Sequence, residues 1–175
     1  PEYQISGSVR FDDGDSARLN FTPQTAGSAR TFTYSVFFKL GNIVGGRLFT
    51  AQTANGNPFF TIDIFQDGDT DNRGIRVNTG DDAIIIITDG RLRDVSAWYH
   101  LVVAVDTTQG TNTNRVKVYI NGEQPALATA TYPDQNYDTV VSSIIKHSVG
   151  SKGNGGSSFD GYMAEVNFVD GFALD

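Results

Sequence analysis

Residues 67–72 carry the densest set of side chains that could hold a metal ion. Their sequence, Asp-Gly-Asp-Thr-Asp-Asn, alternates carboxylates with small or polar residues, and oxygen atoms of this kind are the ligands that Ca²⁺ prefers. The spacing imitates the first half of an EF-hand loop. Asn72, however, stands where that loop needs glycine, and Asn78 stands where it needs a bidentate glutamate, so an EF-hand is excluded. Two interpretations stay open: a simple turn, or a loop calcium site. The ligands of that site would be Asp67, Asp69 and Asp71.

A second polar segment, residues 132–138, places aromatic rings beside amide and carboxylate groups in the order Tyr-Pro-Asp-Gln-Asn-Tyr-Asp. Sugar binding requires an aromatic face for C–H groups and polar side chains for hydroxyl groups. We therefore expect a carbohydrate site here. Its residues would be Tyr132, Asn136, Tyr137 and Asp138. A rival calcium set, Asp134, Asn136 and Asp138, occupies the same segment, and turn formation is again the alternative for it.

The sequence gives little support for hydrolytic catalysis by a Ser-His-Asp triad or for cysteine chemistry. Only two histidines are present, His100 and His147, and no Ser-His-Asp arrangement can be argued around either. The absence of cysteine rules out disulfides and thiolate metal sites, and it permits synthesis in a reducing compartment without requiring it.

The elements that position these segments are strands. Residues 98–106 and 116–120 both alternate apolar and polar side chains with a period of two, which predicts two paired antiparallel strands. The segment between them is polar and broken by Gly110, as expected of a surface loop. Asn121-Gly122 then predicts a type I′ turn, since both residues tolerate positive φ.

The same alternation recurs along the chain and is clearest in residues 31–40. There, Phe32, Tyr34, Val36, Phe38 and Leu40 share one face. Further strands are expected at residues 8–11, 17–21, 47–52, 59–65, 74–78, 83–88, 127–131, 140–143, 147–150 and 162–170. About twelve or thirteen short strands without helical periodicity predict one all-β domain over residues 1–175, a two-sheet antiparallel sandwich with helix nearly absent.

Charge and hydropathy exclude other classes of partner. The net charge of −7 and the lack of a basic stripe argue against nucleic acid. No apolar run approaches the ~20 residues of a membrane span, so no membrane insertion is expected. Residues 1–30 lack the charged and apolar regions of a signal peptide. The chain begins at Pro1 rather than Met, as a processed or excised piece would.

Three segments carry a resemblance to a known family: Trp-Tyr-His-Leu-Val at 98–102, Val-Tyr-Ile-Asn-Gly at 118–122 and Gly-Tyr-Met-Ala-Glu-Val at 161–166. From Val9 to Leu174 the chain resembles the laminin G-like branch of the concanavalin A-like lectin/glucanase superfamily. Residues 96–100, 104–108, 132–138 and 164–171 more narrowly resemble a subgroup met in bacteriophage virion and tail proteins. The resemblance implies a concanavalin A-like jelly-roll sandwich, one sheet often concave, that binds glycans or protein partners, often with calcium.

The resemblance also assigns expectations to single residues. The calcium site at residues 67–72 would be a loop site of the lectin-like kind. Trp98 and His100 match framework positions, so we expect Trp98 in the core and His100 packed in a sheet. Several side chains that point away from the core would line a concave sheet. They are Lys117, Tyr119, Asp63, Glu165 and Asn167.

A glycosidase must be weighed because the superfamily contains such enzymes. Its glucanase members place their carboxyl groups on one strand in a Glu-x-Asp-x-(x)-Glu pattern, as retaining hydrolysis requires. The nearest match, residues 61–66, keeps Asp63 but has Thr61 and Gln66 at the two glutamate positions, which disfavours an enzyme. A pairing of Asp63 with Glu165 is the remaining catalytic option, and solvated strand carboxylates are the favoured interpretation of both.

The sequence thus predicts a non-enzymatic carbohydrate-binding or adhesion module of a phage tail fibre or virion surface, which recognises a host-surface glycan with Ca²⁺ as candidate cofactor. The alternative is a purely structural virion module, a capsid decoration or fibre segment, that binds a neighbouring virion protein. Either would be synthesised in the host cytoplasm and act outside the cell as part of the particle. A homo-oligomer is the expectation for a fibre segment, because fibre modules are usually multimeric.

Overall fold

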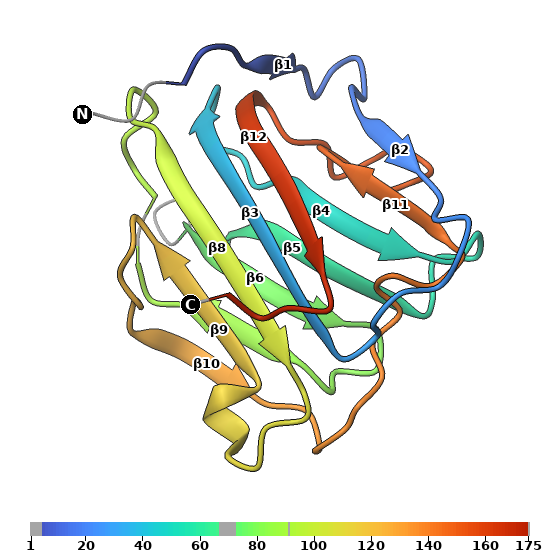
Figure 1. Cartoon of the computed structure of the whole chain (residues 1–175). Coiled ribbons are helices and arrows are strands. Elements are labelled where there is room, and N and C mark those ends of the chain that lie inside the picture. The colour runs from blue at the N-terminus through green and yellow to red at the C-terminus, as the bar shows by residue number, and fades with distance from the viewer. Residues whose placement is uncertain (1–4, 67–72, 91, 175) are drawn as a thin grey trace.

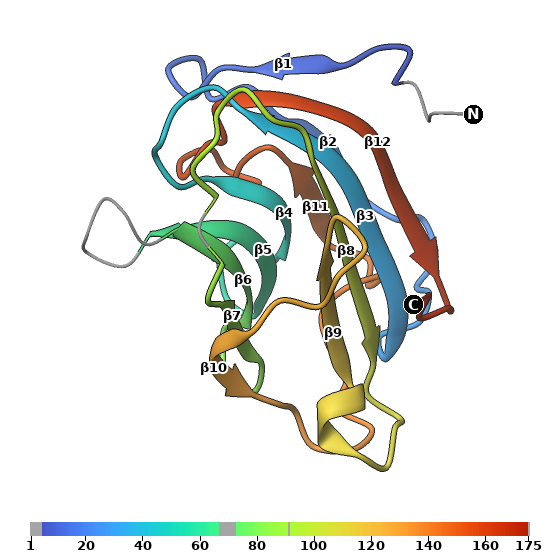
Figure 2. The same cartoon turned by 90° about the vertical axis from the view of Figure 1, so that its left-hand side faces the viewer.

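The computed structural model describes residues 5–66, 73–90 and 92–174. Their strands form two antiparallel sheets that lie face to face, as the edge-on view in Figure 2 shows. The five-stranded sheet has the order β1 (Val9–Phe11), β12 (Gly161–Asp170), β3 (Thr31–Leu40), β8 (Tyr99–Asp106) and β9 (Val116–Ile120). The seven-stranded sheet has the order β10 (Leu127–Thr131), β7 (Ile85–Thr88), β6 (Arg73–Thr79), β5 (Phe59–Gln66), β4 (Arg47–Gln52), β11 (Lys146–Val149) and β2 (Leu19–Phe21). The predicted all-β, two-sheet sandwich is confirmed (Figure 1).

The predicted central pair is present as β8 and β9. They pair antiparallel, with Val103 opposite Val118, and the turn after β9 has positive φ at Asn121 (54°) and Gly122 (83°), as a type I′ turn requires. The long strand β3 lies between β8 and β12 in the middle of the five-stranded sheet. This sheet therefore follows from the alternation that the sequence displays.

Aromatic side chains fill the space between the sheets. The inward residues of β3 meet those of the seven-stranded sheet: the Phe32 and Phe60 rings are 5.4 Å apart, and those of Tyr34 and Phe49 are 5.0 Å apart. All four are at most 1% exposed, and full burial of one such side chain contributes roughly 1.5–3 kcal/mol. These contacts hold the two sheets together.

One predicted strand, residues 140–143, is wrong. The segment forms turns, and Ser142 has a φ of 60°. Its backbone groups find side-chain partners in place of a neighbouring strand: the Val141 N–H donates to Thr139 Oγ1 at 3.2 Å, and the Ser142 N–H donates to His147 Nε2 at 3.1 Å. Apolar residues alone indicated burial here, which is correct for Val141, but not its backbone conformation.

Helical structure in the described ranges is limited to the short 3-10 turn η1 (Asn112–Asn114) within the loop between β8 and β9. Accordingly, no helix of this part of the chain is long and apolar enough to cross a membrane. The two N-terminal strands do not pair with each other: β1 joins β12 in one sheet and β2 joins β11 in the other. The chain thus passes from the edge of one sheet to the edge of the other, along one side of the sandwich.

Candidate functional site

The outer face of the seven-stranded sheet is polar yet largely shielded from solvent. On β4 and β5, residues that point away from the core alternate with the core residues and include Thr50, Gln52, Thr61 and Asp63. These four side chains belong to residues that are at most 6% exposed. A buried polar side chain on the outside of a sheet must be satisfied by neighbours on the same face, and this face supplies them.

The centre of this face is an ion-paired cluster of Arg47, Asp63 and Arg76. Arg76 Nε and Nη2 donate to the two carboxylate oxygens of Asp63 at 3.1 and 3.0 Å. Arg47 Nη1 lies 2.7 Å from Asp63 Oδ2 and also donates to the hydroxyl of Thr61. The Thr61 hydroxyl in turn donates to the Phe49 carbonyl at 3.2 Å. One carboxylate therefore positions two guanidinium groups.

Strand register brings the three charges together. Asp63 on β5 pairs with Arg47 on β4 and with Arg76 on β6, so the three residues form a row across neighbouring strands. A register shift between Arg47 and Phe49 puts Arg47 on the outer face while Leu48 remains in the core. Arg76 also lies over the ring of Phe65, 4.4 Å from its centroid, in cation–π geometry.

The cluster carries more positive than negative charge in a sheltered place. The Arg47 side chain is 14% exposed, that of Arg76 is 27% and that of Asp63 is 4%. Burial lowers the pKa of the Arg47 guanidinium, Asp63 raises it, and the positive Arg76 lowers it. Since an arginine keeps its proton at physiological pH, two cations face one anion here.

Three surface hollows run together along this outer face. Their volumes are about 310, 150 and 390 Å³. Arg47 lines the first and the second, and Gln52 and Asn154 line the second and the third. We call this continuous depression the arginine groove. It crosses β6, β5 and β4, reaches the start of β11, and is walled by residues from the segments 44–46, 53–56 and 152–157.

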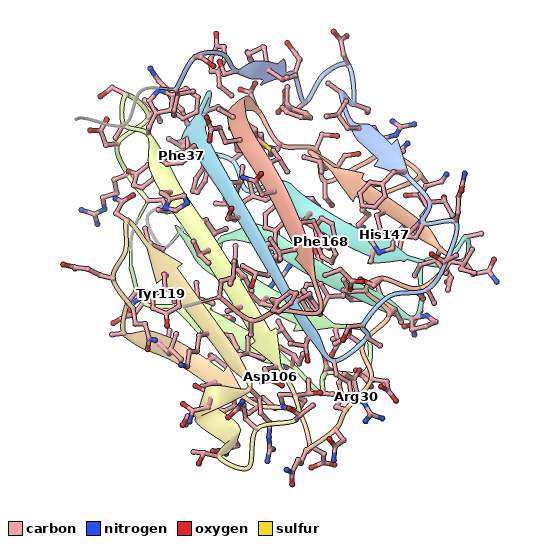
Figure 3. All side chains as sticks on the ribbon, viewed as in Figure 1. Arg30, Phe37, Asp106, Tyr119, His147 and Phe168 are labelled. Carbon is pink, nitrogen blue, oxygen red and sulfur yellow. The ribbon has the colours of Figure 1, made fainter. Side chains whose placement is uncertain are left out.

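The predicted carbohydrate segment, residues 132–138, lies elsewhere, at the end of the sandwich where Figure 3 shows Arg30 and Asp106. It is anchored there because the Asn136 N–H donates to the Thr107 carbonyl at 2.8 Å and the Thr107 hydroxyl donates to the Tyr137 carbonyl at 2.7 Å. Tyr132 packs partly against the core. Asn136 is exposed, with a φ of 63°.

Two of the four predicted sugar-binding side chains in that segment already have protein partners. The Tyr137 hydroxyl lies 3.0 and 2.9 Å from the carboxylate oxygens of Asp81. Asp138 accepts hydrogen bonds from Arg30 Nε and Nη2 at 2.6 and 3.1 Å, and the pKa of Asp138 is lowered by Arg30. A sugar would have to compete with these contacts, so the segment offers fewer available groups than its composition suggests.

The predicted calcium loop cannot be placed, because Asp67, Asp69 and Asp71 lie outside the described residues. Within the described ranges, no group of three or more His, Cys, Asp or Glu side chains is arranged to hold a metal ion. In the rival calcium set, Asp134, Asn136 and Asp138, one ligand is already engaged. Both carboxylate oxygens of Asp138 accept hydrogen bonds from Arg30.

The prediction that Trp98 is a core residue is wrong. Trp98 is 36% exposed, and it directly precedes β8, in which the next residue, Tyr99, turns inward and stacks on Phe38 at 5.4 Å. Because side chains alternate along a strand, an inward Tyr99 requires an outward Trp98. His100 is packed as expected: it stacks on Phe37 with the ring centroids 4.3 Å apart, and partial burial lowers its pKa.

The predicted concave-sheet set is divided between two surfaces. Lys117 and Tyr119 lie on β9, and Glu165 and Asn167 lie on β12, all in the five-stranded sheet, where Figure 3 labels Tyr119. Asp63 lies on the outer face of the other sheet. A catalytic pairing of Asp63 with Glu165 is therefore wrong, since the whole sandwich separates them.

Residues 12–174 match the family described as the concanavalin A-like lectin/glucanases superfamily. The chain belongs to this superfamily. The sequence matches no curated protein at a significant level.

Solved structures with the same fold include a pentraxin, a CBM40 and a bacteriophage tailspike. A heptameric SAP-like pentraxin from Limulus polyphemus superposes with a TM-score of 0.66 at 18% identity, covering 90% of this chain and 71% of that one. The CBM40 of a Ruminococcus gnavus IT-sialidase, solved with α2,3-sialyllactose, gives 0.56 at 13% identity, covering 98% and 95%. Tailspike protein 2 of the Escherichia coli O157:H7 bacteriophage CAB120 gives 0.62 at 13% identity, covering 95% of this chain and 22% of that one.

This superfamily member lacks the carboxylate arrangement of a glucanase at the position that the sequence singles out. Thr61 stands at the first glutamate position, and its hydroxyl is engaged by Arg47 and the Phe49 carbonyl. Asp63 is held by two arginines. Such a set can bind polar and charged groups, whereas general acid catalysis needs a carboxyl group that is free to exchange a proton.

The sequence interpretation missed Arg47 and Arg76. Neither stands in a motif, and the whole of strand β5 lies between them in the sequence. One signal in the sequence was Asp63, a charged residue between two isoleucines in a predicted strand. If both faces of that strand are buried, the carboxylate needs a cationic partner.

Proposed function

We propose that this chain is a non-enzymatic carbohydrate-binding module whose ligand lies in the arginine groove. The observation that carries the proposal is the continuity of the three hollows along one sheet face, over polar side chains that are already held in place by one another. Binding sites of this kind combine fixed hydrogen-bonding groups with apolar surface. In the groove, Phe59 and Phe65 supply the apolar surface.

Fold neighbours support a binding role. The Ruminococcus CBM40 was solved with a sialylated trisaccharide, and a domain of a Geobacillus arabinanase of the same fold was solved with arabinotriose. The non-enzymatic part of the proposal is supported by the lining of the groove: among its described residues, Asp63 is the one carboxylate, and retaining hydrolysis needs two.

For the biological setting, we propose a virion appendage or surface protein that attaches to host glycans outside the cell. The similarity to a phage tailspike over 95% of this chain supports this setting. Ca²⁺ at Asp67, Asp69 and Asp71 stays part of the proposal, since that acidic segment connects β5 and β6, which carry Asp63 and Arg76.

A structural virion module is the second candidate, and one observation favours it. Apolar side chains lie exposed on the outer side of the five-stranded sheet, where the C-terminal segment crosses β3 and the Thr33 hydroxyl donates to the Phe172 carbonyl (2.8 Å; Figure 1). Tyr162, Val166, Phe172 and Leu174 are 39%, 37%, 65% and 50% exposed. A neighbouring protein could cover such a surface.

A glycan-array screen in calcium buffer, repeated after chelation, tests the proposed function. Saturable binding supports it, and loss of that binding after chelation supports the calcium proposal, to be located with Asp69→Ala. A variant at the groove rim, Lys152→Gln, should weaken binding, whereas Asp138→Ala in the other segment should leave it unchanged. The reverse result would move the site to residues 132–138. Absence of binding to any glycan, with or without calcium, would favour the structural module.

A further inference from the structure

We infer that the arginine groove selects acidic glycans and that the guanidinium of Arg47 receives a sugar carboxylate. This inference rests on the proposed function, because it specifies the chemical class of the ligand for the same site. The charges that line the groove are the first observation behind it. Four cations, Arg47, Arg76, Lys146 and Lys152, face one described acid, Asp63.

This local excess of positive charge is opposite in sign to the whole protein, whose net charge is −7. Randomly placed side chains of an acidic protein would give a groove with more acids than bases. A cationic side chain loses part of its solvation when it lines a depression, so a cluster of such cations is costly unless an anion compensates it. Asp63 compensates one of the two arginines at the centre, and a ligand carboxylate would compensate the other.

Of the two central arginines, Arg47 has more hydrogen-bond donors available for a ligand. A guanidinium has five N–H groups in a planar fork. Arg47 uses Nη1 for the Asp63 carboxylate and the Thr61 hydroxyl, and its Nε and Nη2 groups donate to no residue within the described ranges. Arg76, in contrast, directs both Nε and Nη2 to Asp63. The fork of Nε and Nη2 suits bidentate recognition of a planar carboxylate.

The position of Arg47 along the groove strengthens this assignment. It lines both the 310 Å³ hollow over β5 and β6 and the 150 Å³ hollow that leads on to Gln52 and Asn154. A sugar whose carboxylate sits at Arg47 would therefore have room for further units on both sides. Amide and hydroxyl groups of Thr50, Gln52 and Asn154 are suited to the neutral hydroxyl groups of those units.

Asp63 fixes the orientation of the Arg47 guanidinium. The carboxylate is 4% exposed and lies between both arginines, so the Arg47 fork is positioned before any ligand arrives. Such preorganisation lowers the entropic cost of binding. The carboxylate also discourages phosphate dianions, whose larger charge it would repel, relative to a singly charged sugar acid.

Matched glycan pairs test the inference by isothermal titration calorimetry with the intact chain. Each pair differs only in whether its carboxylate carries a charge: α2,3-sialyllactose against its methyl ester, and oligogalacturonate against its methyl ester. These two pairs also distinguish a sialic acid from a uronic acid as the source of the carboxylate. We expect one acidic member to bind at least about tenfold more tightly than its neutral counterpart, and to bind less tightly as ionic strength rises.

The variants Arg47→Gln and Arg47→Lys locate the contact. Arg47→Gln should weaken the acidic glycan by roughly 30-fold or more, as expected for truncation of one partner of a buried charge pair, and leave the weaker neutral glycan nearly unchanged. Arg47→Lys should recover part of this loss, since it keeps charge without the fork. Arg30→Gln, an exposed arginine paired with Asp138 outside the groove, is the matched control, and thermal unfolding of each variant confirms that it folds.

The outcomes separate this inference from the proposed function. Equal binding of acidic and neutral members would overturn the inference while the carbohydrate-binding function stands. Acidic selectivity that survives Arg47→Gln and falls with Lys146→Gln or Lys152→Gln would overturn the assignment to Arg47. Should Arg47→Gln fail to fold, Lys152→Gln together with the matched pairs still decides whether the groove selects acids. No binding by any of the four glycans would overturn the inference, and only absence of binding to every glycan of the array would remove the proposed function as well.

Discussion

Asp63 and Arg76 face each other on the adjacent strands β5 and β6, and the guanidinium of Arg76 engages both carboxylate oxygens at 3.1 and 3.0 Å. Arg47 approaches the same carboxylate from β4 at 2.7 Å. Three strands are thus joined on their outer face by one buried anion. Asp63 is buried almost as completely as a core residue, at 4% exposure of its side chain, whereas the two arginines keep 14% and 27%. The row is built from charges, so its energetics differ from those of the aromatic core between the sheets.

The first prediction concerns this shared carboxylate. Asp63→Asn keeps the shape of the side chain but leaves two neighbouring cations without an anion. We expect the free energy of unfolding to fall by roughly 3 kcal/mol, near the lower end for a broken buried pair because Arg76 keeps some contact with water. Urea denaturation at neutral pH measures this change.

The matched control for Asp63→Asn is Asp138→Asn. Asp138 is also paired with an arginine, Arg30, but its side chain is 62% exposed, and an exposed pair adds little to stability. We expect the control to unfold almost like the original chain. Equal effects of the two substitutions would mean that water screens the Asp63 row far more than its burial indicates.

Much of the sandwich could be predicted because it depends on local patterns. The alternation in residues 31–40 fixes which side chains of β3 enter the core, and Asn121-Gly122 fixes the turn after β9. Trp98 was misassigned although the same alternation, applied one residue earlier than Tyr99, places it outside. Here the family resemblance outweighed the physical pattern, and the pattern was right.

The arginine groove could not be predicted, because it depends on register between strands that the sequence does not encode locally. Arg47 lies opposite Asp63 because β4 contains a register shift. The sequence of residues 44–52 has no pattern that predicts this shift. The walls of the groove come from segments as distant as 44–46 and 152–157. The segment 132–138, in contrast, has an attractive composition, but its Tyr137 and Asp138 are engaged by residues distant in sequence, Asp81 and Arg30.

The second prediction concerns acid stability and His147, which Figure 3 shows on β11. The ring is 1% exposed, Nε2 accepts the Ser142 N–H at 3.1 Å, and Nδ1 lies 2.9 Å from the Ile145 carbonyl, to which it donates. This pattern requires a neutral ring, and burial lowers the pKa of His147. A second proton on Nε2 would break the bond from Ser142.

The sign of the pH effect follows from that lowered pKa. The unfolded chain binds the proton near pH ~6.5, whereas the folded chain resists it, so the stabilising contribution is complete above this value and is lost as pH falls from there through the lower folded pKa. We expect the midpoint of thermal unfolding to drop between pH 7 and pH 5. In His147→Phe, which keeps the stacking on Phe21 and Phe49, the midpoint should be lower at pH 7 and less dependent on pH.

A control is needed because burial also lowers the pKa of His100. His100→Phe preserves the stacking on Phe37 and removes the contribution of this second histidine. The pH dependence that persists in His100→Phe and disappears in His147→Phe belongs to His147. An identical pH profile in all three proteins would show that the carboxylates, and not the histidines, dominate the acid limb.

The third prediction concerns alkaline stability and Tyr137. Burial, assisted by the hydrogen bond to Asp81, raises the pKa of the Tyr137 hydroxyl to about 12, against about 10 in an unfolded chain. Its contribution to stability is therefore complete below pH 10 and is lost as pH rises from there toward 12. Urea unfolding at pH 9 and pH 11 should show a smaller decrease for Tyr137→Phe than for the original chain.

The loss in Tyr137→Phe should be reduced and not abolished, because burial also raises the pKa of Tyr34. Tyr132→Phe, in the same segment, controls for removal of a hydroxyl group as such. If Tyr132→Phe and Tyr137→Phe change the alkaline limb equally, the bond between Tyr137 and Asp81 is not its cause. Glycan binding of Tyr137→Phe should match that of the original chain, because the ligand is expected in the groove.

The last prediction uses Trp98, the single tryptophan of the chain, as a reporter of its own position. At 36% exposure, its fluorescence in the folded protein should be that of a partly hydrated indole and should be quenched readily by acrylamide. Trp98→Phe should change the free energy of unfolding by less than about 1 kcal/mol, as surface substitutions do. The adjacent Tyr99 faces inward and stacks on Phe38, so Tyr99→Ala should cost roughly 2 kcal/mol or more. Blue-shifted emission that resists quenching, together with a larger loss for Trp98→Phe, would instead place the indole in the core and shift the alternation of β8 by one residue.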